Sequence, residues 1–377
     1  MRKVKIIVSN PVAPDPRVSK EASSLARLGY EVRVLAWDRS GRFPRFQKQD
    51  GWTIERLYCK GRFGRGLANL PSLLLFQIRL LLNLLANINQ FDIIHSIDFD
   101  TVIPPLLTRF IFRNKRLIYD IADFYADMLL RVPKWICKII KLIDLWIIGR
   151  VDAIIIADES RIEQVKGSKP KKIVVINNSP NNDPSYYLNV TQALDSSREL
   201  RIFYAGLLSV ERGLIDVLDI VAKNRSWQLD IAGFGADEEI IAKKARPLPN
   251  VNFYGRISYE KVLEHSARSD VLFALYDPKI PNHKYSSPNK LFEAMFLGKA
   301  IIVSKGTGMD DIVKKHDIGL VVEYGNSKQV EEAFRTVAMW NVNQREEYSR
   351  RAQRIFREKY SWSIMEERLK SLYDDIE

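Results

Sequence analysis

The chain has 377 residues, of which 46% are hydrophobic and 28% are charged, and its net charge is +12 at pH 7. This length is typical of two or three domains, and the ordinary apolar share excludes a disordered or fibrous protein. Cys59 and Cys137 are the only cysteines. They are too few for a disulfide scaffold and are not spaced as paired metal ligands, which indicates a reducing compartment.

The positive charge is confined to the first half of the chain. Residues 1–180 contain 30 Lys and Arg against 17 Asp and Glu, whereas residues 181–377 contain 28 against 29. Such asymmetry indicates an anionic partner for the first half, and membrane headgroups, a phosphorylated substrate and nucleic acid are the classes to consider. A solvated basic surface that only aids solubility is the alternative. Nucleic acid is disfavoured because no aromatic and basic binding motif accompanies the charge.

Short β-branched segments alternate with helical patterns in the first half. A strand at 4–8, a helix at 18–28 and a strand at 30–36 are typical of a right-handed βαβ unit. Continuous β-branched runs of this kind favour parallel strands that are covered on both faces. Further strands are predicted at 91–95, 116–119, 153–156 and 172–176.

A polar stretch at 177–197 is predicted to be a linker, and a second α/β series follows it. Its strands are predicted at 200–204, 228–232, 251–254, 271–275, 300–303 and 319–322, and its last helices at 330–337, 345–360 and 362–373. We therefore predict two doubly wound α/β domains, 1–180 and 181–360, that face a central cleft, with a terminal helix at 361–377 packing back toward the first domain. Ligands bind beyond the carboxyl ends of the strands in such sheets.

Two segments of the first half have patterns that suit a membrane surface. Residues 67–88 are rich in Leu but include Arg79 and several Asn, so we expect a half-buried or surface-lying helix and not a spanning one. Residues 134–150 form a basic amphipathic helix, although its apolar stripe is also explained by packing on the first sheet. The expected location is cytoplasmic, with peripheral attachment to the inner face of the membrane.

Three segments of the second half suit the phosphates of a nucleotide. Gly206–Gly213 is a glycine turn before a helix start, which offers backbone N–H groups and a positive dipole end, and Arg212 adds a charged donor. Gly233 and Gly235 follow the next strand and allow a close backbone approach. Tight turns also explain both glycine segments.

The third segment, Ser-Ser-Pro-Asn-Lys-Leu-Phe-Glu-Ala-Met at 286–295, is the most specific. We expect a helix that starts after Ser287 with Pro288 in its first turn. The backbone N–H groups near its N-terminus are then those of Asn289, Lys290 and Leu291. Glu293 lies among apolar neighbours and therefore requires a polar partner. Its carboxylate could accept two ribose hydroxyls while Lys290 meets phosphate.

Two polar features of the first half have more than one explanation. Asp98 and Asp100 have the spacing of a metal-binding pair, but no further ligand cluster accompanies them, so no metal site is predicted. His95 is expected at the carboxyl end of a strand. A substrate contact and a hydrogen-bonded structural role explain it equally well.

Together these motifs resemble the retaining glycosyltransferases of family 4, which have the GT-B fold of two Rossmann-like domains. The resemblance extends over essentially the whole chain. It rests on residues 14–18, 21–22, 28–32, 91–95, 119–120, 204–206, 211–213, 232–235, 287–295, 297–299 and 306–308.

The resemblance implies transfer of a hexosyl group from a UDP- or GDP-sugar, with retention, to a glycan or lipid-linked acceptor in cell-envelope polysaccharide or glycoconjugate synthesis. It implies no metal or other cofactor, a donor site in the second domain and an acceptor site in the first. The catalytic candidates are Arg212 and Lys290 for the diphosphate and Glu293 for the ribose. The donor-binding candidates are Gly206, Arg212, Gly233, Gly235, Asn289, Lys290, Leu291 and Glu293. The acceptor-side candidates are Arg17, His95 and Asp120.

Three positions depart from the family pattern. Tyr285 stands where the family often has the first of two Glu, Leu207 where a basic residue often follows the glycine, and Ala122 where many members have a His. Asp277 could supply a nearby carboxylate. Two alternatives therefore stay open: an enzyme like the nucleotide-sugar 2-epimerases of the same fold, and a non-catalytic nucleotide-sugar-binding subunit.

Overall fold

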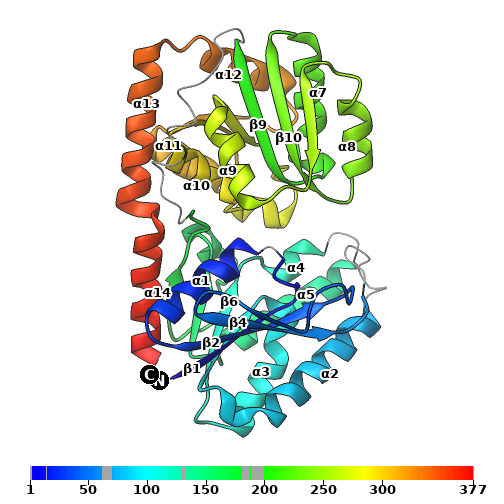
Figure 1. Ribbon diagram of the computed structural model, residues 1–377, viewed down its shortest axis with the longest axis vertical. Helices are drawn as coiled ribbons and strands as arrows, with labels where there is room; N and C mark the ends of the chain where they lie inside the picture. The colour runs from blue at the N-terminus through cyan, green and yellow to red at the C-terminus, as the bar shows by residue number, and fades with distance from the viewer. Residues whose placement is uncertain are drawn as a thin grey trace. The chain divides into compact units, whose positions relative to one another are not determined.

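The structure is a computed structural model that describes residues 2–13, 15–61, 70–129, 132–180, 187 and 199–376. The chain divides into two compact units. Unit 1 comprises Met1–Asn177 and Met365–Glu377, and unit 2 comprises Asn178–Ile364. Each unit is built on one sheet with helices on both faces (Figure 1). Most of the predicted linker at 177–197, and residues 67–69 of the Leu-rich segment, lie outside the described residues.

In the described part of unit 1, eight strands form a sheet in the order β3-β4-β2-β1-β5-β6-β7-β8. The strands are β1 (Lys3–Val8), β2 (Glu31–Asp38), β3 (Phe46–Lys48), β4 (Trp52–Tyr58), β5 (Ile93–Ile97), β6 (Arg116–Ile121), β7 (Ala153–Ile156) and β8 (Ile173–Val175). Neighbouring strands are parallel, except that β3 pairs antiparallel with β4. The central strands are buried because helices cover both faces, as their β-branched runs indicate.

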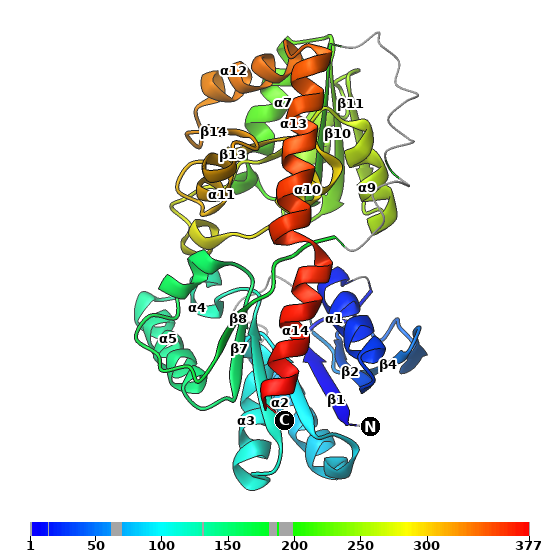
Figure 2. The ribbon, with the colours of Figure 1, turned by 90° about the vertical axis from the view of Figure 1, so that its left-hand side faces the viewer.

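The helices of unit 1 form two layers. They are α1 (Pro16–Arg27), α2 (Leu70–Ala86), α3 (Phe99–Ile111), α4 (Tyr125–Met128), α5 (Lys134–Ile148) and the end of α14 (Trp362–Ile376). Buried residues of α2, α3 and α5 share one core with the sheet, whereas α1 and α14 lie on its other face (Figure 2). The described residues contain no helix that is both long and apolar enough to span a membrane.

Helices α2 and α5 bury only part of their apolar surface. Of α2, Phe76, Leu80 and Leu84 are buried, in line with the half-buried helix predicted there. Of the apolar residues of α5, Ile147 and Ile148 are fully buried. The large apolar side chains that α5 leaves exposed are Trp135, Ile139, Leu142, Ile143 and Trp146. Ile140 and Leu145 also pack against the core of the sheet, so this packing explains one side of α5 but not its exposed apolar side chains.

In the described part of unit 2, six parallel strands form a sheet in the order β11-β10-β9-β12-β13-β14. The strands are β9 (Leu200–Leu207), β10 (Trp227–Phe234), β11 (Val251–Gly255), β12 (Val271–Ala274), β13 (Ala300–Ser304) and β14 (Leu320–Val322). The helices are α7 (Leu214–Lys223), α8 (Glu238–Ala245), α9 (Tyr259–Arg268), α10 (Asn289–Leu297), α11 (Met309–His316), α12 (Ser327–Ala338) and α13 (Val342–Ile355). Strand order reverses between β9 and β12, so their carboxyl ends flank the switch point at which such sheets bind ligands.

Three boundaries differ from the predicted ones. Strand β5 runs to Ile97, so the prediction that His95 ends a strand is wrong: it lies in mid-sheet, opposite Ile6 of β1 and Ile118 of β6. Strands β9 and β10 continue to Leu207 and Phe234, which places Gly206 and Gly233 inside the sheet. Helix α10 begins at Asn289, one residue later than expected, because the extended ψ of 147° at Pro288 makes that residue the cap.

Candidate functional site

The carboxyl ends of β9 and β10 meet through two glycines. Gly206 is the register partner of Gly233, with φ values of +151° and +147°. A Cβ at Gly233 would lie 1.9 Å from the Gly206 carbonyl oxygen, and one at Gly235 would lie 2.2 Å from the Leu208 oxygen. Because Gly233 and Gly235 have no Cβ, the backbones of the two strand ends lie in contact beside the switch point, and no other residue type fits at these two positions.

The loop after β9 is held by a carboxylate that the sequence analysis missed. Asp237 Oδ2 accepts hydrogen bonds from the Val210 N–H at 2.9 Å and the Ser209 hydroxyl at 3.3 Å. Gly213, at φ +69°, is the N-cap residue of α7, and a Cβ there would lie 2.7 Å from the Leu275 Cβ. Residues on both sides of Arg212 are therefore fixed.

Arg212 and Lys290 lie on neighbouring aromatic rings at the switch point. The guanidinium carbon of Arg212 is 3.8 Å from the ring centroid of Tyr276, which follows β12. The Nζ atom of Lys290 is 3.5 Å from the ring centroid of Tyr204 on β9 and 5.7 Å from that of Tyr276. The Tyr204 hydroxyl donates to the Leu207 carbonyl at 2.7 Å, which fixes its ring. Cation–π contact stabilises both side chains where they lie.

Lys290 is buried beside the glycine contact. A Cβ on Gly206 would lie 3.4 Å from its Nζ atom, and among the described residues this atom has no hydrogen-bond acceptor. Burial, with a smaller effect of Arg212, holds the pKa of Lys290 well below its usual range, against the opposing effect of Glu293. Lys290 thus supplies a basic group near Gly206. The family pattern often has its basic residue directly after this glycine, where this chain has Leu207. An anion that binds here would recover the cost of burying the ammonium group.

Glu293 lies one helical turn from Lys290 and is 3% exposed. Its neighbour is Tyr259, the first residue of α9. Burial and the Glu293 carboxylate raise the pKa of the Tyr259 phenol well above its usual range. Tyr259 is therefore a polar neighbour of the kind that a buried Glu requires.

The remaining donor-side candidates lie around the start of α10. Asn289 is half-buried there. Leu291 is part of the core, and its N–H already donates to the Pro288 carbonyl at 3.1 Å, so the expectation that this N–H is left for a ligand is wrong. Tyr285 is half-buried, and Asp277 Oδ1 accepts from the Lys279 N–H at 2.9 Å.

His283 is a further buried group at this site that the sequence analysis missed. Its Nδ1 atom lies 3.1 Å from the Asp277 carbonyl, and its ring centroid lies 5.2 Å from that of Tyr276. Burial and the nearby Arg212 lower the pKa of His283 to about 4, so the ring is neutral at pH 7. Since a carbonyl only accepts, Nδ1 carries the proton. No hydrophobic periodicity indicates that His283 is buried, because the residues around it include Pro and Asn and form no regular pattern.

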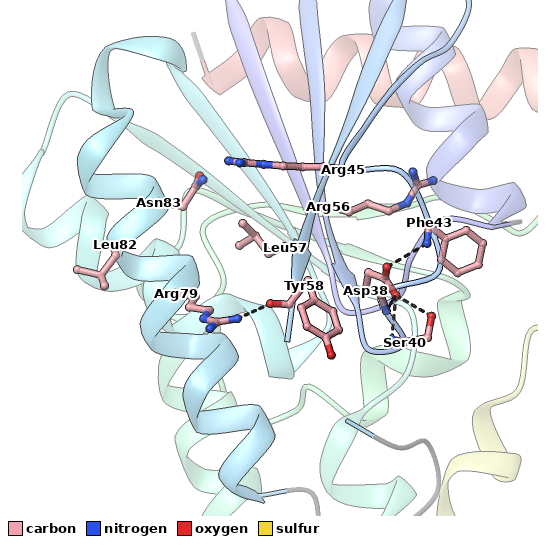
Figure 3. Close-up of a pocket in the computed structure, with 11 residues that line it drawn as sticks. Asp38, Ser40, Phe43, Arg45, Arg56, Leu57, Tyr58, Arg79, Leu82 and Asn83 are labelled. Carbon is pink, nitrogen blue, oxygen red and sulfur yellow. Dashed lines mark hydrogen bonds between the residues drawn. The ribbon is translucent and has the colours of Figure 1, made fainter. Parts of the chain in front are cut away.

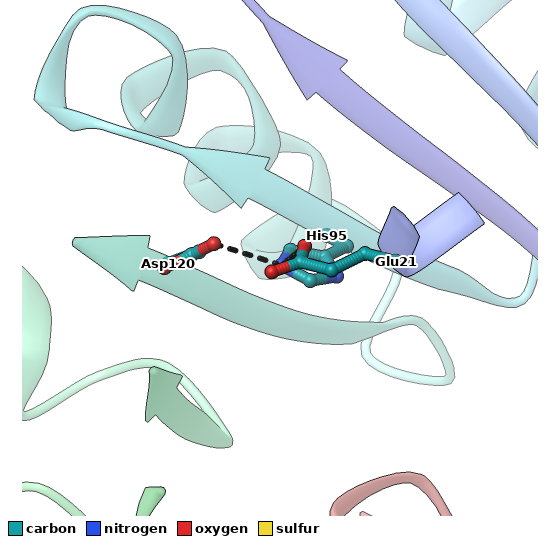
Figure 4. A group of neighbouring side chains, drawn as sticks. All are labelled: Glu21, His95 and Asp120. Atoms are coloured by element: carbon teal, nitrogen blue, oxygen red, sulfur yellow. Dashed lines mark ion pairs between the residues drawn. The ribbon is translucent and has the colours of Figure 1, made fainter. Parts of the chain in front are cut away.

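The three acceptor-side candidates come together in one cluster of unit 1. Figure 4 shows His95 and Asp120 of this cluster together with Glu21. Arg17 binds both oxygens of Asp120, at 2.9 and 2.8 Å, and donates to the Ile176 carbonyl at 2.9 Å. Glu21, which was not predicted as a site residue, lies 3.2 Å from Arg17. His95 Nε2 lies 3.7 Å from Glu21 and 3.8 Å from Asp120. Arg17 therefore compensates the charge of Asp120 within the fold.

The same cluster joins helix α14 to the sheet. His95 Nδ1 lies 2.9 Å from the Tyr373 hydroxyl. Burial raises the pKa of Glu21 to about 7, against the opposing effect of Arg17. The pKa of Asp120 is lowered despite its burial, because Arg17 and His95 favour the carboxylate. His95 is therefore enclosed by hydrogen-bonding and charged neighbours within the fold.

In both carboxylate groups of unit 1, other residues of the fold already bind the carboxylate oxygens. Among the described residues, Glu21, His95 and Asp120 have ligand atoms close enough to share an ion, within 4.8 Å of one another. Arg17 already binds Asp120 through two hydrogen bonds and would repel a cation there. Asp98 Oδ1 instead accepts the N–H groups of Ala122 at 3.1 Å and Asp123 at 3.2 Å.

Residues 191–355 match the model of a family described as glycosyl transferases group 1. The match covers less than half of the chain and lies within unit 2, where Arg212, Lys290 and Glu293 are found. It supports a glycosyltransferase. No curated protein sequence matches the chain.

Solved structures of similar fold match nearly the full length of the chain. Sucrose-phosphate synthase from Thermosynechococcus elongatus is 15% identical with a TM-score of 0.76, and the match covers 100% of this chain and 99% of that one. HepE from Anabaena in complex with UDP-glucose is 14% identical with a TM-score of 0.72 and full coverage of both chains. WaaG, a glycosyltransferase involved in lipopolysaccharide biosynthesis, is 13% identical with a TM-score of 0.69, covering 98% and 99%. These likenesses show the fold, and the predicted GT-B class of two Rossmann-like domains is confirmed.

We predict that Tyr373→Phe weakens the attachment of α14 to unit 1. The substitution leaves the buried Nδ1 atom of His95 without its partner, which costs about 1–2 kcal/mol. Hydrogen exchange of the α14 amides measures this local opening free energy. Tyr58→Phe is the control, because Tyr58 is 53% exposed. Equal protection of α14 in the variant and the parent would contradict the assigned role of this hydrogen bond.

Proposed function

We propose that this protein is a retaining glycosyltransferase that moves a hexosyl group from a UDP- or GDP-sugar to a glycan or lipid-linked acceptor in cell-envelope polysaccharide or glycoconjugate synthesis. The observation that carries the proposal is the convergence of Arg212 and Lys290 on the ring of Tyr276 at the switch point of the unit 2 sheet, with Lys290 beside Gly206. The UDP-glucose complex of HepE supports a UDP-sugar donor. Retention and the acceptor class follow from the resemblance to family 4.

In this proposal, unit 2 binds the donor and stabilises its leaving group. Negative charge accumulates on the diphosphate as the bond to the anomeric carbon breaks. Arg212 and Lys290 are held in place on Tyr276 and Tyr204, so they offset that charge without rearranging. Glu293 accepts the ribose hydroxyls and thereby orients the nucleoside. We assign no protein nucleophile and no resident metal.

We assign the acceptor to unit 1, on the basis of the resemblance and of its positive charge. His95 and Asp120 are fully buried, so they are proposed to act on an acceptor indirectly. Asp120 pairs with the last residue of β5, Ile97, near the carboxyl ends of these two strands. The cluster of Arg17, His95 and Asp120 would hold those strand ends, and the loops that follow them, in position.

Arg212→Ala and Lys290→Ala are each expected to weaken donor binding about tenfold or more, because each removes a charged contact to the diphosphate. The thermal shift produced by UDP-glucose, taken against each variant's own melting temperature, measures the loss. Lys284→Ala is the control, since Lys284 is an exposed cation close in sequence. Thermal shifts and turnover equal to those of the wild type in both site variants would contradict the assignment of Arg212 and Lys290 to the donor site. Donor binding without transfer to any acceptor would instead favour the non-catalytic subunit.

Donor binding is expected to take up a proton. The pKa of Lys290 is lowered in the free protein, so above that pKa its amine is neutral, and an adjacent diphosphate raises the pKa again. Affinity therefore falls as the pH rises between the free and bound pKa values, by up to about tenfold per pH unit. Calorimetry in buffers of different ionisation enthalpy measures the uptake. Proton uptake should vanish in Lys290→Arg. Its absence in the parent protein would refute the coupling between donor binding and protonation of Lys290.

We also propose peripheral attachment to an anionic membrane surface on the cytoplasmic side through α2 and α5. The exposed apolar side chains of α5 alternate with Lys134, Lys138 and Lys141, as in helices that lie in a headgroup layer. The protein should sediment with vesicles that contain phosphatidylglycerol, and increasing salt should release it. A protein that stays in the supernatant at low salt would rule out this attachment.

A further inference from the structure

A hollow of about 690 Å³ lies in unit 1 between the loop that follows β2 and helix α2 (Figure 3). Its lining includes three arginines, Arg45, Arg56 and Arg79, together with Tyr58 and Leu82. None of these residues belongs to the candidate donor site or to the buried cluster of Arg17. The hollow therefore requires its own explanation.

The carboxylate within the hollow is used by the loop itself. Asp38 Oδ1 accepts the N–H groups of Ser40 and Gly41 at 2.9 Å and the Ser40 hydroxyl at 2.9 Å, and Oδ2 accepts the Phe43 N–H at 3.3 Å. These hydrogen bonds lower the pKa of Asp38 although burial opposes them. Asp38 thus fixes the loop that carries Arg45, and it does not pair with the arginines in any hydrogen bond of the described residues.

Arg56 is a cation of the hollow that three hydrogen bonds hold in place. It donates to the carbonyls of Pro11 at 2.8 Å and Pro44 at 2.9 Å and to the Gln47 side chain at 2.7 Å. These acceptors are neutral, so they satisfy the guanidinium N–H groups without cancelling the charge. Burial lowers the pKa of Arg56, with Asp38 as the opposing charge.

Arg45 and Arg79 are the accessible cations of the hollow. The Arg45 side chain is 70% exposed and its nearest carboxylate, Glu55, is 3.7 Å away, a loose ion pair. Arg79 is exposed and donates through Nη1 to the Tyr58 carbonyl, one of the five N–H groups of a guanidinium. In Figure 3, Arg45 extends toward Asn83 of α2, and Arg79 projects from the same helix. An anion in the hollow would meet guanidinium groups from two elements, the loop before β3 and helix α2.

An apolar surface adjoins this cationic hollow. Leu74, Ile78 and Leu82 are 54%, 57% and 61% exposed. They follow one another at intervals of four residues and therefore form a row along one side of α2. Leu82 itself lines the hollow. A ligand that fits both parts carries a compact anion joined to an apolar chain.

We propose that this hollow binds the phosphate of a membrane lipid, with its acyl chain along the row of Leu74, Ile78 and Leu82. The guanidinium groups of Arg45 and Arg79 suit phosphate because they bind its oxygens in pairs. Contact between the acyl chain and this row removes apolar surface of the lipid and of the protein from water. The inference deepens the proposed membrane attachment, on which it rests, and is independent of the proposed donor chemistry.

The test uses the full chain and dihexanoyl phosphatidic acid, which is soluble as a monomer, with calorimetry as the measurement. We expect binding by the parent protein and a loss of about tenfold for each arginine reversed in the double variant Arg45→Glu/Arg79→Glu. The matched control is Arg113→Glu/Arg116→Glu, which changes the same charge at exposed arginines of unit 1 outside the hollow. Leu82→Ser should weaken binding of the lipid and leave binding of inorganic phosphate unchanged.

Three outcomes would overturn the inference. Equal losses in the two double variants would show diffuse attraction to a basic surface. Unchanged binding in Arg45→Glu/Arg79→Glu would place the lipid elsewhere. Inorganic phosphate that binds as tightly as the lipid would make the hollow a site for free phosphate. The thermal shift with UDP-glucose separates these results from the donor proposal. Monomer binding without vesicle sedimentation would refute the membrane attachment alone.

Discussion

The close approach of Gly233 to Gly206 is the contact on which the candidate donor site depends. A Cβ at Gly233 would lie 1.9 Å from the Gly206 carbonyl, so β9 and β10 end against each other only because Gly233 lacks a side chain. A side chain at Gly233 would therefore move the end of β9. Tyr204, which supports Lys290, lies on that strand, and the loop that carries Arg212 follows it. The positions of both cations therefore depend on the missing side chain of Gly233.

The two units differ in whether their buried charged groups are paired. In unit 1, Arg17 binds Asp120 through two hydrogen bonds, so the charge of this carboxylate is compensated within the fold. In unit 2, the Lys290 amine is buried on a tyrosine ring with no hydrogen-bond acceptor among the described residues. Protonation of an amine buried in this way costs stability until an anion arrives. A compensated cluster maintains a fold, whereas an uncompensated one favours a binding site.

The sequence predicts this arrangement only where local pattern determines it. The β-branched runs located the central strands, and the three-residue spacing placed Lys290 and Glu293 on neighbouring turns of one helix. The end of β5 could not be located in this way, because pairing with β1 and β6 extends it beyond His95 to Ile97. The stacking of Lys290 on Tyr204 joins residues 86 positions apart in the numbering, and no local spacing encodes it.

The cations of the first half fall into two groups in the structure. Some arginines act within the fold: Arg56 ties three segments together, and Arg109 binds Asp152 at 2.9 and 2.6 Å. Others remain exposed beside apolar rows, as Arg79 does on α2. A surface that is basic only for solubility explains the exposed cations but gives no reason for large apolar side chains among them. The proposed attachment to a lipid surface would account for both, because headgroups attract cations while acyl chains cover apolar side chains.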